Sequence, residues 1–155
     1  MNLASSTLCK PGYMTIHLDN ARWFRTAFGQ PLLKGFCPLD DSGESTKVLT
    51  LQTRLIEEEC KELVAAVSHA VSLDEQSHGI TDAKVQILKE LSDVLFTCYQ
   101  LAAAINFDVD EALQRVFESN MSKLGPDGNP IYREDGKVLK GPNYKEPDLI
   151  DLVVS

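Results

Sequence analysis

The sequence lacks any run of about eighteen uncharged residues, the length that a membrane-spanning helix requires. Met1 is followed by neither a basic segment nor a long apolar one, so no secretion signal is expected. The 4 cysteines show no Cys-x-x-Cys spacing, which predicts free thiols in a reducing compartment rather than a disulfide or zinc framework. We therefore expect a soluble, cytoplasmic protein.

Positive charge is also scarce. Lysine and arginine total 15 against 23 acidic residues, for a formal net charge of −8, which argues against general nucleic-acid binding. An anionic substrate would need divalent metal ions and a few well-placed lysines, and lysines are concentrated late in the chain. A chain of 155 residues suffices for one domain without a covalent or metal staple.

Apolar residues recur at three- and four-residue intervals and predict four helices, over about residues 19–28, 46–72, 81–105 and 108–123. We expect Asp19 to cap the first helix and Gly29 to end it. Asp108 and Glu111 have the spacing of a capping box at the start of the fourth. The third helix is apolar around most of its circumference, which predicts a central position between other helices.

The chain after residue 124 has a different character, because glycine and proline are frequent there. Residues 131–140 predict a small hairpin turning at Asp135-Gly136, and residues 141–155 an irregular arm. We expect one all-α domain over 1–155, with a helical core at 19–124 and a C-terminal hairpin and arm at 125–155. The predicted architecture is an oligomeric, antiparallel helical bundle of four to five helices.

Four acidic residues stand out on a helical wheel, because they point into apolar stripes: Glu59 and Glu62 on the second helix, Glu90 and Asp93 on the third. Buried carboxylates cannot stay ionised without compensation, since the desolvation of each costs several kcal/mol. Lys89, like Lys61, falls on another face of its helix, which leaves a bound metal ion as the simpler compensation.

Two antiparallel helices can converge these four carboxylates on one point, as in a di-metal site. No histidine lies at the Glu-x-x-His spacing of di-iron bundles, and all-oxygen ligation favours Mg²⁺, with Mn²⁺ as a possible substitute. Carboxylate-held Mg²⁺ serves phosphate chemistry, which indicates hydrolysis of a phosphoanhydride. Glu58 borders the acidic face and is our candidate for the general base.

Other interpretations stay open. A single Glu-x-x-Glu pair is usually a solvated helix face, and the chain could be a helical dimerisation module that is indifferent to Mg²⁺. A di-iron oxidase is disfavoured by the positions of the histidines.

Three segments carry a resemblance to a known family. Glu58-Glu59-Cys60-Lys61-Glu62, followed by Glu90-Leu91-Ser92-Asp93, resembles the Glu-Glu-x-x-Glu and Glu-x-x-Asp signature of the MazG-like, all-α nucleoside triphosphate pyrophosphohydrolases. Asn120-Met-Ser-Lys123 resembles an Asn-x-x-Lys element that several members carry. The resemblance covers about residues 46–124.

The resemblance implies a function. Metal ligands would be Glu59, Glu62, Glu90 and Asp93. Asn120 and Lys123 would contact the phosphates of the substrate. The reaction would be cleavage between the α- and β-phosphates of a nucleoside triphosphate, giving monophosphate and pyrophosphate, as a housecleaning or pool-control activity in a homodimer or homotetramer.

The segment from Gly125 onward is similar to a phosphoribosyl-ATP pyrophosphatase-like subset. Lys137, Lys140 and Tyr144 are therefore candidates for contacts with the phosphate or the base, although the lysines also fit an exposed hairpin. A dUTP-specific or phosphoribosyl-ATP activity remains an alternative. A deoxynucleoside triphosphate ranks first, because the chain lacks dense arginine and lysine signals.

Overall fold

The computed structural model describes residues 16–34, 43–73 and 79–153. They form α1 (Ile16–Ala27), α2 (Glu44–Val71), α3 (Ile80–Ala104), α4 (Val109–Met121) and a short 3-10 helix, η1 (Ile150–Leu152). Within these ranges no strand forms beyond an isolated antiparallel bridge between Tyr132 and Val138. The all-α class and the four predicted helices are confirmed.

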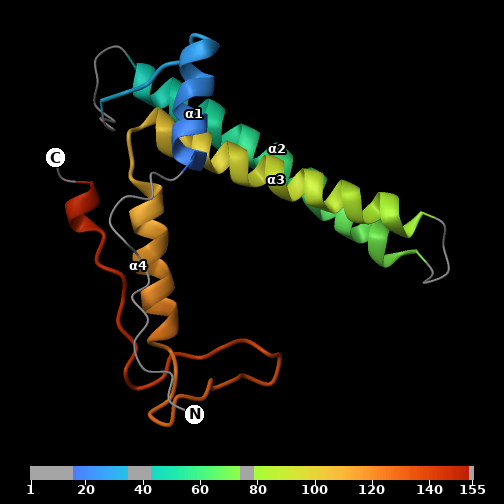
Figure 1. The fold of residues 1–155 in the computed structure, drawn as a ribbon, viewed down its shortest axis with the longest axis vertical. Helices are drawn as coiled ribbons and strands as arrows, with labels where there is room; N and C mark the ends of the chain where they lie inside the picture. The colour runs from blue at the N-terminus through green and yellow to red at the C-terminus, as the bar shows by residue number, and fades with distance from the viewer. Residues whose placement is uncertain (1–15, 35–42, 74–78, 154–155) are drawn as a thin grey trace.

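The two longest helices, α2 and α3, lie side by side and antiparallel as a long hairpin, and α1 packs across α3 near one end of that hairpin (Figure 1). The core lies where these three helices meet. Leu18 and Ala21 of α1 are buried against Ala102 and Ala103 of α3. Alanines at this contact allow the helices to approach closely, because they carry only a methyl group.

The ends of α1 are set by local hydrogen bonds. Gly29 adopts a left-handed φ of 63° after the last turn, and the N–H of Gln30 donates to the Arg25 carbonyl at 2.8 Å. This αL ending confirms Gly29 as the residue that stops the helix. The prediction that Asp19 caps it is wrong, because α1 already begins at Ile16 and Asp19 lies in its first turn.

α4 begins as expected, since the Glu111 N–H donates to Oδ1 of Asp108 at 3.1 Å. However, α4 leads away from the α2–α3 pair, so the four described helices of one chain do not form a single bundle (Figure 1). The 131–140 hairpin forms at the far end of α4, with Gly136 at a left-handed φ of 84° in its turn.

The C-terminal arm returns along α4 and is attached to it at several points. Lys145 donates its N–H to Ser122 Oγ at 2.8 Å, and its carbonyl accepts from Ser119 Oγ at 2.7 Å. Gly141 passes close to the end of α4, where an added Cβ would lie 2.6 Å from the Lys123 carbonyl oxygen. The arm can therefore start only with a residue that has no side chain.

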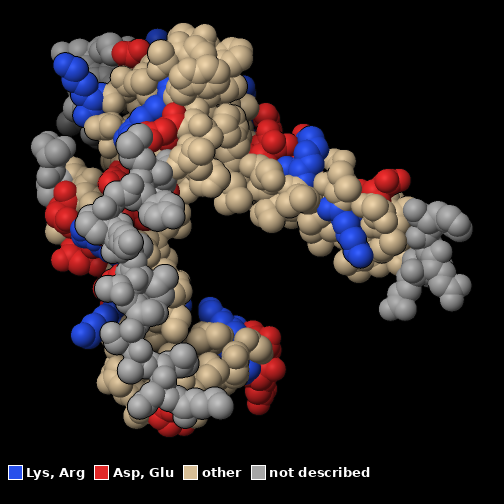
Figure 2. All heavy atoms as spheres, in the orientation of Figure 1, with Lys and Arg blue, Asp and Glu red and all other residues tan. Residues whose placement is uncertain are grey.

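One face of the α2–α3 hairpin is apolar and exposed. On α3 the exposed fractions are 62% for Val85, 65% for Leu88, 42% for Leu91 and 53% for Leu95. In Figure 2, much of the surface of the α2–α3 pair that faces α4 is uncharged. α3 thus lies between α1 and α2 but is not surrounded within one chain. No helix in the described ranges is long and apolar enough to cross a membrane.

Candidate metal centre

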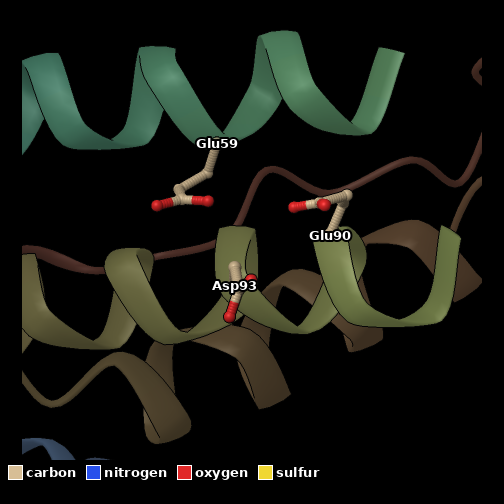
Figure 3. Close-up of side chains that lie close together, drawn as sticks. All are labelled: Glu59, Glu90 and Asp93. Carbon is tan, nitrogen blue, oxygen red and sulfur yellow. The ribbon is translucent and has the colours of Figure 1, made fainter. Parts of the chain in front are cut away.

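Three carboxylates meet in the space between α2 and α3. Glu59 extends from α2 toward α3, and Glu90 and Asp93 lie one turn apart on α3 (Figure 3). Each offers an oxygen atom, and these atoms all lie within 4.8 Å of one another. The antiparallel pairing of the helices creates this cluster, because it brings the Glu-x-x-Glu and Glu-x-x-Asp segments to the same level.

Glu90 is the most deeply buried of the three, with only 3% of its side chain exposed. Its Oε1 accepts a hydrogen bond from the Gln86 side-chain amide and another, at 3.0 Å, from Lys89 Nζ. Asp93 is 40% exposed and pairs with the same ammonium at 2.9 Å. Lys89 therefore bridges the two acidic residues that α3 contributes to the cluster.

Our prediction that Lys89 points away from the acidic face is wrong. Lys89 precedes Asp93 by four residues, so the two side chains are neighbours on the surface of α3. Its four-carbon stem also lets the ammonium reach the adjacent Glu90. Hydrogen bonds to Asp93 and Glu90 raise the pKa of Lys89. Gln86 was missed as well, although its position four residues before Glu90 was visible in the sequence.

Glu59 has the environment of a carboxylate that lacks enough positive charge. Desolvation raises its pKa, and so do the charges of Asp93, Glu62 and Glu90, while Lys89 acts in the opposite direction. One ammonium faces three carboxylates, so the formal charge of the cluster is −3 + 1 = −2. A cation placed among these oxygen atoms would remove the repulsion that the free protein retains.

The donor set fits a hard cation. All three ligand atoms are carboxylate oxygens, and no histidine or cysteine belongs to the cluster found in the described ranges. Such sets suit Mg²⁺ or Mn²⁺ better than zinc or iron.

A family comparison places the acidic cluster within a family match. The sequence profile of the MazG-like family matches residues 49–136, which include most of α2, all of α3 and α4, and residues 131–136 of the 131–140 hairpin. The chain belongs to the MazG-like family. A search of curated proteins returned no match. MazG-like proteins are generally nucleoside triphosphate pyrophosphatases, hydrolases that typically depend on a metal ion.

The fourth expected ligand of this MazG-like chain is not part of the cluster. Glu62 is exposed on α2, one turn beyond Glu59, and acts on Glu59 through its charge. The candidate base, Glu58, is exposed and pairs with Arg54 on its own helix at 3.6 Å. The structure thus brings together three of the four expected ligands and leaves the adjacent glutamates at the rim.

The expected phosphate contacts lie elsewhere. Lys123 donates to Oδ1 of Asn120 at 2.5 Å. Asn120 lies in the last turn of α4 and Lys123 just beyond it, at the end of α4 that is farthest from the α2–α3 pair (Figure 1). The structure therefore does not bring these MazG-like residues to the acidic cluster of the same chain.

The remaining candidates follow the end of the family match. Lys140 places its Nζ 4.1 Å from the ring centroid of Tyr144, so these two side chains contact each other. Lys137 is exposed in the hairpin. All three lie beyond residue 136, where the MazG-like match stops.

Proposed function

We propose that this chain is a Mg²⁺-dependent pyrophosphohydrolase of a nucleoside or deoxynucleoside triphosphate, cleaving between the α- and β-phosphates to give the monophosphate and pyrophosphate. The observation that carries the proposal is the cluster of Glu59, Glu90 and Asp93 within 4.8 Å, in a chain of the MazG-like family. A net negative cluster of oxygen donors between two helices has no evident role in stability, because its like charges repel.

The ligands would be Glu59, Glu90 and Asp93, and Glu62 would join them by turning its exposed side chain inward. When bound, the metal ion would neutralise phosphate charge and activate the attacking water. Mn²⁺ would be accepted by the same donors. Lys89 would then be displaced from Glu90 and Asp93, and its exposed ammonium would be free to contact a phosphate oxygen of the substrate.

Glu58 remains the proposed general base. It neighbours the ligand Glu59 and is not itself part of the cluster, so it can accept a proton from the attacking water without losing a metal contact. To accept this proton, Glu58 must first break its ion pair with Arg54 and bind the water instead. The two side chains are 67% and 53% exposed, so breaking their ion pair costs little.

The phosphate contacts are proposed to come from a second copy of the chain. The end of α4, where Asn120 and Lys123 lie, is far from the acidic cluster of the same chain (Figure 1), while the α2–α3 pair has an exposed apolar face. A homodimer or homotetramer that covers this face would remove it from water and could present the end of one α4 to the partner's carboxylates. Lys137, Lys140 and Tyr144 would approach the substrate together with that end of α4.

The test is a panel of natural triphosphates incubated with Mg²⁺ and scored separately for pyrophosphate and orthophosphate. We expect pyrophosphate, and a loss of activity by orders of magnitude in Glu59→Gln and Asp93→Asn. Glu57→Gln is the matched control, because Glu57 is exposed and outside the cluster. Release of orthophosphate alone would reject cleavage between the α- and β-phosphates.

Two alternatives give different results in the same panel. Activity confined to dUTP, or to phosphoribosyl-ATP when that compound is added, would indicate a narrower enzyme. A non-enzymatic dimerisation module would hydrolyse nothing, and its melting temperature would not respond to Mg²⁺.

A further inference from the structure

A cavity of about 500 Å³ lies between the end of α1, the residues that follow it and the first turns of α2. Its lining combines polar side chains, including Arg25, Lys47 and Gln52, with the apolar Val48 and Leu51. This volume and this mixture are those of a site for a small organic molecule.

Gln52 is the unusual residue in this lining. Its side chain is buried, with 2% of the residue exposed, yet its Oε1 has no hydrogen-bond partner among the described residues. Within the described ranges, Gln52 Oε1 is the only buried side-chain N or O atom that lacks a hydrogen-bond partner. An unsatisfied buried polar group costs about 1–3 kcal/mol, so this amide lowers the stability of the ligand-free protein. The terminal torsion of glutamine is soft, and the amide can turn into the cavity when a partner arrives.

Arg25 adds a second incompletely used polar group. The residue is 1% exposed, and Nε and Nη2 donate to the Pro31 carbonyl at 2.9 and 2.7 Å. Nη1 reaches only the carbonyl and side-chain oxygens of Gln100, at 3.5 Å each. No carboxylate of the described residues forms an ion pair with Arg25, and desolvation lowers its pKa. A stronger acceptor in the cavity would therefore be favourable.

The cavity and the acidic cluster share one face of α2. Gln52 precedes Glu59 by seven residues, which is two turns of α2, so the two side chains leave the same face of the helix. Two turns correspond to roughly 10 Å along the axis. The nucleoside part of a nucleotide, from its α-phosphate to the far edge of its base, spans a comparable length.

We propose that this cavity receives the base of the substrate, and that Gln52 reads its edge. The inference rests on the proposed function, since the acidic cluster locates the phosphates. Gln52 would accept from a ring N–H and donate to the adjacent carbonyl, while Val48 and Leu51 pack against the ring. A carbonyl oxygen has two lone pairs and can accept from Gln52 and Arg25 together, whereas a ring nitrogen has one. The site therefore prefers bases with a ring N–H beside a carbonyl, such as uracil, thymine and guanine.

The first test is kinetic. In Gln52→Met, which keeps the volume and removes the amide, we expect KM for dUTP, dTTP and dGTP to rise about tenfold and kcat to change less than about twofold, since roughly one paired hydrogen-bond set is lost. Discrimination against dCTP and dATP should shrink by the same factor. Thr53→Val, an exposed neighbour on α2, is the matched control and should leave KM unchanged.

The second test measures stability without any nucleotide. If Gln52 serves only the fold, Gln52→Met should lower the melting temperature. If Gln52 instead binds a ligand, the removal of its unsatisfied amide should leave the melting temperature unchanged or raise it. A lower melting temperature with unchanged KM would overturn the proposal.

The third test separates this proposal from the proposed function. The ¹⁵N-labelled full chain is titrated with deoxyuridine, which has no phosphate, in the absence of Mg²⁺, and the side-chain signals of Gln52 and Arg25 are followed. Selective shifts of these signals support the base site even if no triphosphate is hydrolysed. Hydrolysis by the wild type, with no shift and no kinetic effect of Gln52→Met, would reject the base site and leave the proposed function intact.

Discussion

Glu59 on α2 and Asp93 on α3 come from different helices and yet place carboxylate oxygens within 4.8 Å of each other (Figure 3). Their repulsion adds to burial in raising the pKa of Glu59. Such a contact lowers the stability of the free protein, and it persists because the packing of α2 on α3 holds both backbones in place. Under the proposed function this cost has a use, because a cation would find its ligands already assembled.

Glu59→Gln should stabilise the metal-free protein and abolish its response to Mg²⁺. The raised pKa means that the folded state disfavours the ionised form of Glu59. The carboxyl group therefore contributes most to the stability of the fold below its unfolded pKa, and this contribution is lost as the pH rises through its folded pKa. We expect the variant to melt roughly 1–3 °C above wild type at pH 7 in EDTA, with the difference vanishing on acidification. Scanning fluorimetry from pH 4 to 8, with and without MgCl₂, measures both effects. Equal Mg²⁺ stabilisation in wild type and variant would remove Glu59 from the ligand set.

Lys89→Met should make the site easier to load. In the free protein Lys89 pairs with Glu90 at 3.0 Å and Asp93 at 2.9 Å, and a metal ion must displace it. The variant should melt lower without metal and reach half of its Mg²⁺-induced shift at roughly one-third of the wild-type concentration. Lys84→Met, an exposed neighbour on α3, is the control. A higher Mg²⁺ requirement in Lys89→Met would mean that Lys89 assists the ion.

Tyr99→Phe should change the stability of the protein at alkaline pH. Burial, together with the hydrogen bond from Tyr99 Oη to Asp110 at 2.8 Å, raises the pKa of Tyr99 to about 12. The hydroxyl should contribute about 1 kcal/mol at pH 7. This contribution is present below the unfolded pKa of about 10 and is lost as pH rises toward the folded value. Urea unfolding between pH 7 and 11.5 should show the wild type converging on the variant, whereas exposed Tyr132→Phe should match wild type throughout.

Arg115→Gln should release the C-terminal arm from α4 without disturbing the acidic cluster. Arg115 donates to Asp151 at 2.5 and 2.9 Å and to the Asp148 carbonyl at 2.9 Å. We expect amide hydrogen exchange in residues 148–153 to accelerate about tenfold and exchange in α2 and α3 to stay unchanged. Arg133→Gln, which loses only a local pair with Asp135, is the control. Faster exchange throughout the chain would show that the arm supports the whole fold.

The helices were predictable because their signals are local. Spacing of apolar residues, Gly29 and the Asp108 cap act within a few residues, and the four helices agree with the prediction to within a few residues. The acidic positions were predictable for the same reason, since the phase of Glu59, Glu90 and Asp93 on their helices depends only on helical geometry.

What the sequence by itself determined is therefore the helices and the acidic faces of α2 and α3. Only the tertiary structure decided that Glu62 stays outside the cluster, that α4 leads away, and that Gln52 Oε1, beside a cavity, has no hydrogen-bond partner among the described residues. These outcomes depend on side-chain reach and on how separate helices meet. Local periodicity carries no information about either.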